Sequence, residues 1–299
     1  MFENWPMRYA SSEWDQLRNG ITMHKRNSTA CIHANQITEQ NADLEWTSDD
    51  ITELRTSGFQ FLDNLLTRQQ CDEMYEYFVQ SECYDFYNQH SKFNIAEAPH
   101  NVRLGRHDIK TNLKCPHVVG LMTNERIISM ASEYLGAPAT LSLMLPMWSF
   151  NNNADVENIN MQLYHRDCDD SRNLKLFVLL SDTEENDGSQ QYVLRSHAAE
   201  GLPVEMYKIR RYSDEEVYSH FDKNDIVDIS GSRGLTWIAD TYGIHKGTPP
   251  SIERSNRLLF QLQFTYNPVP LFNYKSYRYS KWDEMSDLVK YSTRKYLRR

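Results

Sequence analysis

The hydrophobic residues change their spacing along the chain, from a helical period to short alternating runs. Between residues 124 and 135 they recur at helical spacing, with Asn124 placed to cap the start and Gly136 placed to end the helix. After this helix come short β-rich runs separated by Gly, Asn, Asp and Pro. The pattern predicts strands at residues 140–148, 158–167, 174–181, 190–195, 225–230, 235–240 and 257–266.

Two further patterns define the ends of the folded domain. Residues 58–62 alternate as a strand does, and Thr67 and Gln70 form a capping box that opens a helix to about residue 80. Short strands behind a helical layer indicate a mainly β fold with a helical layer, that is, a double-stranded β-helix (a jelly-roll or cupin-like barrel). We expect an N-terminal extension at 1–50, the jelly-roll domain at 51–280, and a basic C-terminal segment at 281–299 that forms a surface helix.

The last predicted strand has two different faces. Leu258, Phe260, Leu262 and Phe264 share one face, whereas Arg257, Gln261 and Gln263 share the other with Leu259 and Thr265. The first face is suited to a hydrophobic core. The second is too polar for one, so we expect it to look out to water or in to a polar site.

Composition and charge narrow the class of protein. The chain has 299 residues, of which 40% are hydrophobic, and a net charge of -9 with a pI near 5.6. This acidic balance argues against nucleic acid or an anionic membrane as a partner. Five cysteines without a CxxC pair, no signal pattern and no long apolar run predict a reduced, cytoplasmic protein. We expect a monomer or homodimer that acts on a small molecule.

The chemistry is suggested by His165 and Asp167, which are separated by one residue within the predicted strand 158–167. Alternation places both side chains on one face, with Arg166 pointing outward between them. His245, at the close of an apolar strand, is the best third ligand. Two histidines and one carboxylate form the facial triad of non-haem Fe(II) oxygenases, which leaves positions open for a cosubstrate and O2. Arg257 could hold a dicarboxylate such as 2-oxoglutarate in bidentate fashion.

Several stretches resemble the phytanoyl-CoA dioxygenase family (PhyH-like) of Fe(II)/2-oxoglutarate-dependent oxygenases. Residues 54–71 (LRTSGFQFLDNLLTRQQC) are similar to the family's opening strand and helix, and residues 134–139 (YLGAPA) to the helix end before its barrel. Residues 174–180, together with Asp182, Gly188 and the LRSH sequence at 194–197, resemble the strand pair that follows its metal motif. The resemblance covers roughly residues 51–267.

The resemblance implies a role for particular residues. It assigns iron to His165, Asp167 and His245, and the distal carboxylate of 2-oxoglutarate to Arg257. Phe177 matches an aromatic position beside the cosubstrate, and Lys110 a basic position upstream of the barrel.

Arg254 competes with Arg257 for the cosubstrate, because neither lies at the family's usual distance from the histidine. Strand alternation favours Arg257, which shares its face with Gln261 and Gln263.

The implied activity is that of a non-haem Fe(II)- and 2-oxoglutarate-dependent dioxygenase. It would use O2 to oxidise an unactivated C–H bond of a metabolite or natural-product intermediate, with release of succinate and CO2. Related halogenases have a small residue in place of the carboxylate, so Asp167 favours hydroxylation over halogenation.

Alternatives remain open for both the protein and its residues. The protein could be a non-catalytic jelly-roll binding protein, or a cupin-like metalloenzyme that does not use 2-oxoglutarate. His165 and Asp167 could be ordinary strand and turn residues, and Arg257 could be a structural ion-pair partner of Glu253 or Asp240. Residues 94–110 and 151–158 are the candidate substrate-contacting segments.

Overall fold

The computed structural model describes residues 48–63, 65–88, 90–150, 160–185, 187–251, 256–267 and 276–299. The competing Arg254, the segment 151–158 and nearly all of the predicted extension 1–50 lie outside these ranges. Residues 48–50 begin a helix, α2, that the sequence patterns did not predict. Within the described ranges, no helix has both the length and the apolar character that crossing a membrane requires.

The centre of the molecule is a large antiparallel sheet with the strand order β1-β9-β6-β11-β5-β4-β2-β3. A smaller antiparallel sheet, β10-β7-β8, and a parallel pair, β12-β13, complete the strands of the described ranges. The bounds of the strands are β1 Phe59–Leu62, β2 Cys83–Asp85, β3 Lys92–Phe93, β4 Leu104–Arg106, β5 Thr140–Ser149, β6 Asn173–Leu179, β7 Gln190–Val193, β8 Ile226–Ile229, β9 Thr236–Ala239, β10 His245–Gly247, β11 Arg257–Thr265, β12 Tyr277–Arg278 and β13 Leu297–Arg298.

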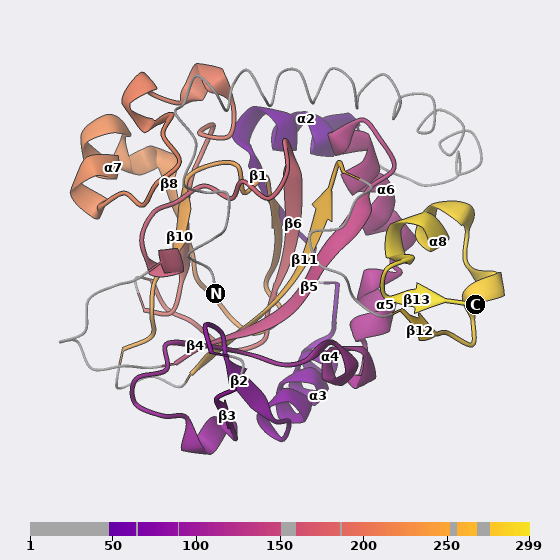
Figure 1. Ribbon diagram of the computed structural model, residues 1–299. Helices are drawn as coiled ribbons and strands as arrows, with labels where there is room; N and C mark the ends of the chain where they lie inside the picture. The colour runs from indigo at the N-terminus through magenta and orange to yellow at the C-terminus, as the bar shows by residue number, and fades with distance from the viewer. Residues whose placement is uncertain are drawn as a thin grey trace.

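Helices cover one face of the large sheet, and the small sheet lies on the other side (Figure 1). The α-helices are α2 Ser48–Ser57, α3 Arg68–Val79, α4 Ile109–Lys114, α5 Val118–Met122, α6 Glu125–Leu135, α7 Asp214–His220 and α8 Asp287–Thr293. Short 3-10 turns are η2 Ile95–Glu97, η3 Asn160–Gln162, η4 Ala199–Gly201, η5 Val204–Met206, η6 Lys223–Asp225 and η7 Trp282–Glu284. Two sheets with a helical layer form the mainly β jelly roll that the sequence predicted.

Local signals in the sequence set the helix ends. Thr67 and Gln70 form the expected capping box at the start of α3. Asn124 accepts a hydrogen bond from the Ile127 amide at the start of α6, and Gly136 ends this helix with φ at 72°, where a side chain would be strained.

The strand β11 has the two faces that its sequence predicted. Leu258, Phe260, Leu262 and Phe264 all lie in the core between the sheet and the helices. On the opposite face, Leu259 joins a second hydrophobic cluster between the two sheets, to which Tyr192 of β7 and Ile229 of β8 also belong. Arg257 and Gln261 on this face line a pocket, so the polar face looks inward rather than out to water.

Two predicted elements differ from the structure. In place of a strand at 158–167, the described part of this segment contains the turn η3 followed by isolated β-bridges at Tyr164 and His165. No strand ladder forms because these two residues pair with different partners, Tyr212 and His245 respectively. In place of one surface helix, the C-terminal segment contains η7, α8 and β13, and it buries Tyr296 in the helical core.

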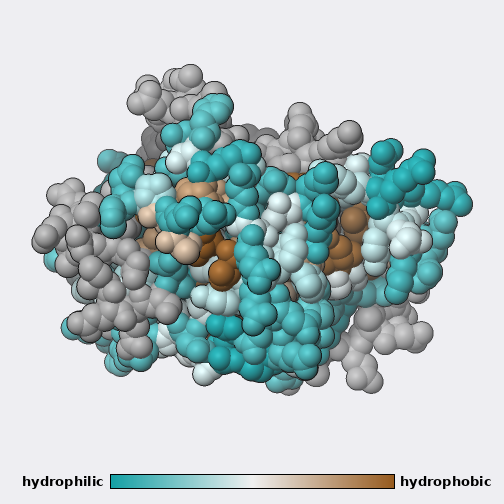
Figure 2. Space-filling view, turned by 90° about the horizontal axis from the view of Figure 1, so that it is seen from below, coloured by the Kyte–Doolittle hydropathy of each residue, from teal (hydrophilic) through white to brown (hydrophobic). Residues whose placement is uncertain are grey.

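The outer surface is mostly polar on the face seen from below, with only small hydrophobic areas visible between hydrophilic side chains (Figure 2). Large hydrophobic side chains are accordingly exposed only singly among the described residues, as at Phe61 and Val204.

Phe260 provides a test of the core. Its side chain is fully buried, so Phe260→Ala should lower the free energy of unfolding by about 3–5 kcal/mol. Val204→Ala, at a position that is 70% exposed, should change it by less than about 0.5 kcal/mol. Urea unfolding followed by circular dichroism measures both, and equal effects of the two substitutions would contradict this packing.

His107 predicts a pH dependence of stability. Its Nδ1–H donates to the Glu82 carbonyl, and the Trp148 Nε1–H donates to its Nε2, so both ring nitrogens are used in the neutral form. Burial lowers the pKa of His107 to about 4, against 6.5 when unfolded. The folded chain therefore loses stability as pH falls from about 6.5 towards 4, because the unfolded chain binds the proton more readily.

His107→Gln should remove this contribution. When the pH is lowered from 7 to 4, the free energy of unfolding should fall by about 3 kcal/mol less in the variant than in the parent protein. This value follows from the difference between the folded and unfolded pKa of His107. Urea unfolding at the two pH values measures the loss, and an identical loss in both proteins would refute the assignment.

Candidate metal centre

A pocket opens between the two sheets, with about 490 Å³ of empty space when the part open to solvent is included. The large sheet contributes the first wall and the small sheet the second. The large-sheet residues are Leu104, Met147, Ser149, Lys175, Phe177, Arg257 and Gln261, and the small-sheet residues are Gln190, His245 and Gly247. His165 and Asp167 enter from the irregular segment between β5 and β6.

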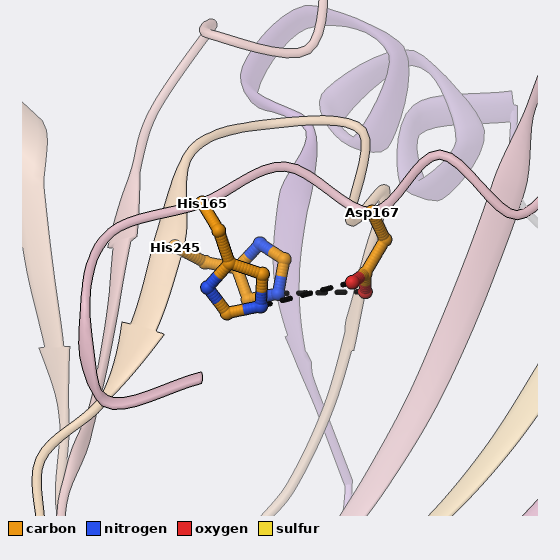
Figure 3. A group of neighbouring side chains, drawn as sticks. All are labelled: His165, Asp167 and His245. Atoms are coloured by element: carbon orange, nitrogen blue, oxygen red, sulfur yellow. Dashed lines mark ion pairs between the residues drawn. The ribbon is translucent and has the colours of Figure 1, made fainter. Parts of the chain in front are cut away.

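The structure brings His165, Asp167 and His245 together at this pocket (Figure 3). The Nε2 atom of His165 lies 3.7 Å from Oδ1 of Asp167, and the Nε2 atom of His245 lies 3.5 Å from Oδ2. The two imidazole centroids are 4.3 Å apart. One potential ligand atom from each residue lies within 4.8 Å of the others, so a single ion could contact all three. This is the only such group within the part of the chain that the structure describes.

Backbone hydrogen bonds hold the three residues in place. The amides of His165 and His245 each donate to the carbonyl of the other residue at 2.9 Å. The Asp167 amide donates to the carbonyl of Thr241 at 2.8 Å, which fixes the carboxylate to the loop before β10. The two imidazoles are therefore opposite each other although they are 80 positions apart in the sequence.

Each imidazole is also oriented by its own chain. Nδ1 of His165 lies 2.8 Å from the Leu163 carbonyl, and Nδ1 of His245 lies 2.9 Å from the Gly243 carbonyl. A carbonyl only accepts, so each Nδ1 carries the proton and each Nε2 presents its lone pair. This second contact of the ring is the usual way in which proteins orient a metal-binding histidine.

The charges around the triad favour the metal-binding protonation states. Burial lowers the pKa of His165 well below its ordinary value, so the ring is neutral near pH 7. Burial tends to raise the pKa of Asp167, but the Lys175 ammonium at 2.6 Å outweighs it. The pKa of Asp167 therefore lies well below its usual range, and the carboxylate is ionised. A neutral imidazole and a carboxylate anion are the forms that bind metals.

Arg257 lies on the opposite wall of the same pocket. Its side chain is almost fully buried, and it donates to the carbonyls of Gly188 and Ser189 and to the hydroxyl of Ser149 at 2.8–3.0 Å. Burial lowers the pKa of Arg257 to about 10. No described residue gives it an ion pair, and its Nε atom is buried without a hydrogen-bond partner. The carboxylate of Asp240 instead accepts from Tyr134 and from the Tyr242 amide.

The other residues predicted from the sequence lie at different places. Phe177 lines the pocket and stacks on Trp237 with centroids 5.1 Å apart. Lys110 lies exposed on α4, outside the residues that line the pocket. Arg166 points away from the triad as expected, but it is buried rather than outward. Its Nε donates to the Tyr242 carbonyl, and its guanidinium lies 4.0 Å from the centre of the Tyr242 ring.

Sequence reasoning did not identify Lys175, which forms the ion pair with Asp167. A signal was present, because Lys175 is the one charged residue in the otherwise hydrophobic run 174–180. A lysine inside a fully buried strand needs an anionic partner. Asp169 was also missed. Burial and then the charge of Asp167 raise the pKa of Asp169, whose carboxyl group contacts Gln263.

Several solved structures are similar to this chain. EctD from S. alaskensis with 2-oxoglutarate and 5-hydroxyectoine aligns over 74% of this chain and 78% of its own, with 15% identity and a TM-score of 0.50. HygX from Streptomyces hygroscopicus with nickel and 2-oxoglutarate aligns over 79% and 91%, with 16% identity and a TM-score of 0.49. SnoN, an α-ketoglutarate-dependent epimerase from nogalamycin biosynthesis, aligns over 72% and 80%, with 14% identity and a TM-score of 0.48.

At this level of identity the comparison with EctD establishes a shared jelly-roll fold. No protein-family model matches the sequence, and no curated protein sequence matches it.

The triad predicts metal binding by the purified protein. We expect one first-row divalent ion per chain, and we expect His165→Ala and Asp167→Ala each to weaken binding at least tenfold, since each removes one of three ligands. His220→Ala, at an exposed position on α7, should leave binding unchanged. Equilibrium dialysis with Ni(II) measures the affinities. Unchanged affinity in both triad variants would refute the site.

Proposed function

We propose that this protein is a non-haem Fe(II)- and 2-oxoglutarate-dependent dioxygenase of the phytanoyl-CoA dioxygenase type. The observation that carries this proposal is one pocket with two complementary features. A group of two histidines and a carboxylate lies on one side, and the guanidinium of Arg257 lies on the other without an anionic partner among the residues that the structure describes.

The three side chains of the triad fit iron. Two imidazoles and one carboxylate form a facial set that leaves positions of an octahedral ion open. Asp167 supplies the carboxylate that halogenases lack, so we propose oxidation of a C–H bond, most simply hydroxylation.

The surroundings of Arg257 fit the distal carboxylate of 2-oxoglutarate. A buried cation is costly unless an anion compensates it, and the described residues around Arg257 offer only neutral acceptors. A carboxylate at this position would accept from the guanidinium and from the Ser149 hydroxyl. The same arrangement disfavours a cupin-like metalloenzyme without 2-oxoglutarate and a scaffold without a ligand, because neither explains the buried cation.

With iron held by His165, Asp167 and His245, 2-oxoglutarate and O2 would supply the oxidising power for a C–H bond of the substrate, with succinate and CO2 as the other products. The chain would position these components and exclude water from them. Lys175 holds Asp167 ionised and oriented, and the carbonyls of Leu163 and Gly243 fix the two imidazoles. Phe177, which stacks on Trp237, presents an apolar ring to the pocket.

We further propose that the protein acts on a small metabolite in the cytoplasm. The described cysteines, Cys71, Cys83, Cys115 and Cys168, are all free thiols, in keeping with a reducing compartment.

Turnover of 2-oxoglutarate tests the proposal. The Fe(II)-loaded protein should form succinate from 2-oxoglutarate in air, and Arg257→Gln should raise the KM for 2-oxoglutarate about 10- to 100-fold, because a charge-assisted interaction of about 1.5–3 kcal/mol is lost. Arg278→Gln, at an exposed position on β12, is the control. Loss in Arg254→Gln with an unchanged Arg257→Gln would assign the anchor to Arg254. No succinate from the parent protein with a broad substrate panel would refute the function.

A further inference from the structure

A third cation, Arg211, lies beside the triad and takes no part in the arrangement described so far. Tyr164 and Tyr212 form an antiparallel bridge, in which the Tyr212 amide donates to the Tyr164 carbonyl at 2.9 Å. In an antiparallel register the neighbouring pair is His165 and Arg211, and paired residues share one face. Tyr164 and Tyr212 are both buried in one hydrophobic cluster, so His165 and Arg211 belong to the other face.

His165 thus has a neighbour on each side. Its backbone pairs with His245 on one side, and the segment that carries Arg211 pairs with Tyr164 on the other. Asp167 and Arg211 lie close enough for a direct electrostatic effect, since the carboxylate of Asp167 raises the pKa of Arg211 against the lowering effect of burial. The Arg211 charge in turn contributes to the low pKa of His165. The register and the electrostatics agree that this guanidinium lies near His165 and Asp167.

Arg211 has no partner among the described residues. Its Nε atom is buried without a hydrogen bond, and no described carboxylate forms an ion pair with its guanidinium. Three neighbouring cations have partners. Arg210 forms an ion pair with Glu216, Lys246 with Asp214, and Arg166 donates to the Tyr242 carbonyl. Arg211 differs from them because its guanidinium is partly buried and unpaired, an arrangement that a ligand would resolve.

The charges of the pocket indicate the kind of ligand. Lys175 compensates Asp167, and under the proposed function Arg257 compensates the distal carboxylate of 2-oxoglutarate. The second carboxylate of the cosubstrate offsets one of the two charges of Fe(II), so the site keeps a net positive charge to which Arg211 contributes. The planar guanidinium matches a carboxylate or a phosphate group in bidentate geometry.

We propose that the substrate carries an oxyanion, a carboxylate or phosphate group, and that Arg211 binds this group and so holds a nearby C–H bond over the metal. This inference rests on the proposed function for the identity of the cosubstrate. It identifies Arg211 as a substrate-binding residue and the substrate as an anionic metabolite.

A matched set of small probes tests the proposal without turnover. Protein loaded with Ni(II) and saturated with 2-oxoglutarate is titrated with benzoate, with phenyl phosphate and with the neutral benzamide by isothermal titration calorimetry. We expect at least one anion to bind about tenfold or more tightly than benzamide. The tighter anion distinguishes a carboxylate substrate from a phosphate substrate. Arg211→Gln should abolish the preference, and Arg211→Lys should retain part of it as a point charge.

The control is Arg210→Gln, at the adjacent exposed arginine that is paired with Glu216, and it should keep the preference of the parent protein. Equal binding of anions and benzamide by the parent protein would overturn the proposal, and so would a preference that persists in Arg211→Gln.

Titration of 2-oxoglutarate itself separates this inference from the proposed function. If Arg211→Gln weakens 2-oxoglutarate binding as much as Arg257→Gln does, Arg211 belongs to the cosubstrate and the proposal fails. If the parent protein binds no 2-oxoglutarate, the proposed function fails, and the same probes titrated against the Ni(II)-loaded protein alone still decide whether Arg211 binds an anion.

Discussion

The site depends on the two reciprocal backbone hydrogen bonds between His165 and His245. They join the irregular segment after β5 to the small sheet, and they bring together two imidazoles that lie far apart in the sequence. Once this pair is fixed, the hydrogen bond from the Asp167 amide to Thr241 places the carboxylate next to both rings. A change in register by one residue would turn His165 into the hydrophobic cluster and Tyr164 into the pocket, so the chemistry requires this pairing.

The second constraint is that the two faces of the large sheet have different roles, one in stability and the other in the site. One face is covered by helices and is almost wholly hydrophobic, so it supplies the stability of the fold. The other face contributes less to stability, because it places the polar side chains of Lys175, Arg257 and Gln261 in the pocket. Buried cations at such positions destabilise the fold unless anions compensate them. Asp167 compensates Lys175, and we assign a carboxylate of the cosubstrate to Arg257.

Much of the fold could be predicted from local signals, because these depend on a few neighbouring residues. Alternation in β11 separated Leu258 from Arg257, and the caps at Thr67 and Asn124 set two helix starts. The irregular conformation of the segment around His165 could not be predicted, because its isolated bridges depend on partners that are distant in the sequence.

The candidate site was predicted in part for the same reason. The spacing of His165 and Asp167 and the position of His245 were enough to suggest a triad, because they are visible in the sequence. Arg211 is placed next to His165 only by the pairing of Tyr164 with Tyr212. The spacing of residues in the sequence does not indicate this pairing. Lys110 shows the opposite case. The family resemblance suggested a role for Lys110, but its side chain is exposed on α4.

The central claim is that the triad and Arg257 together hold one iron ion with its 2-oxoglutarate. Anaerobic titration of 2-oxoglutarate into the Fe(II)-loaded protein tests it most directly, because chelation of ferrous iron by a 2-oxo acid produces a broad visible charge-transfer absorption. The account predicts that this absorption grows to saturation at one equivalent of 2-oxoglutarate per bound iron. A protein that binds one Fe(II) per chain at the triad but develops no such absorption with excess 2-oxoglutarate would contradict it.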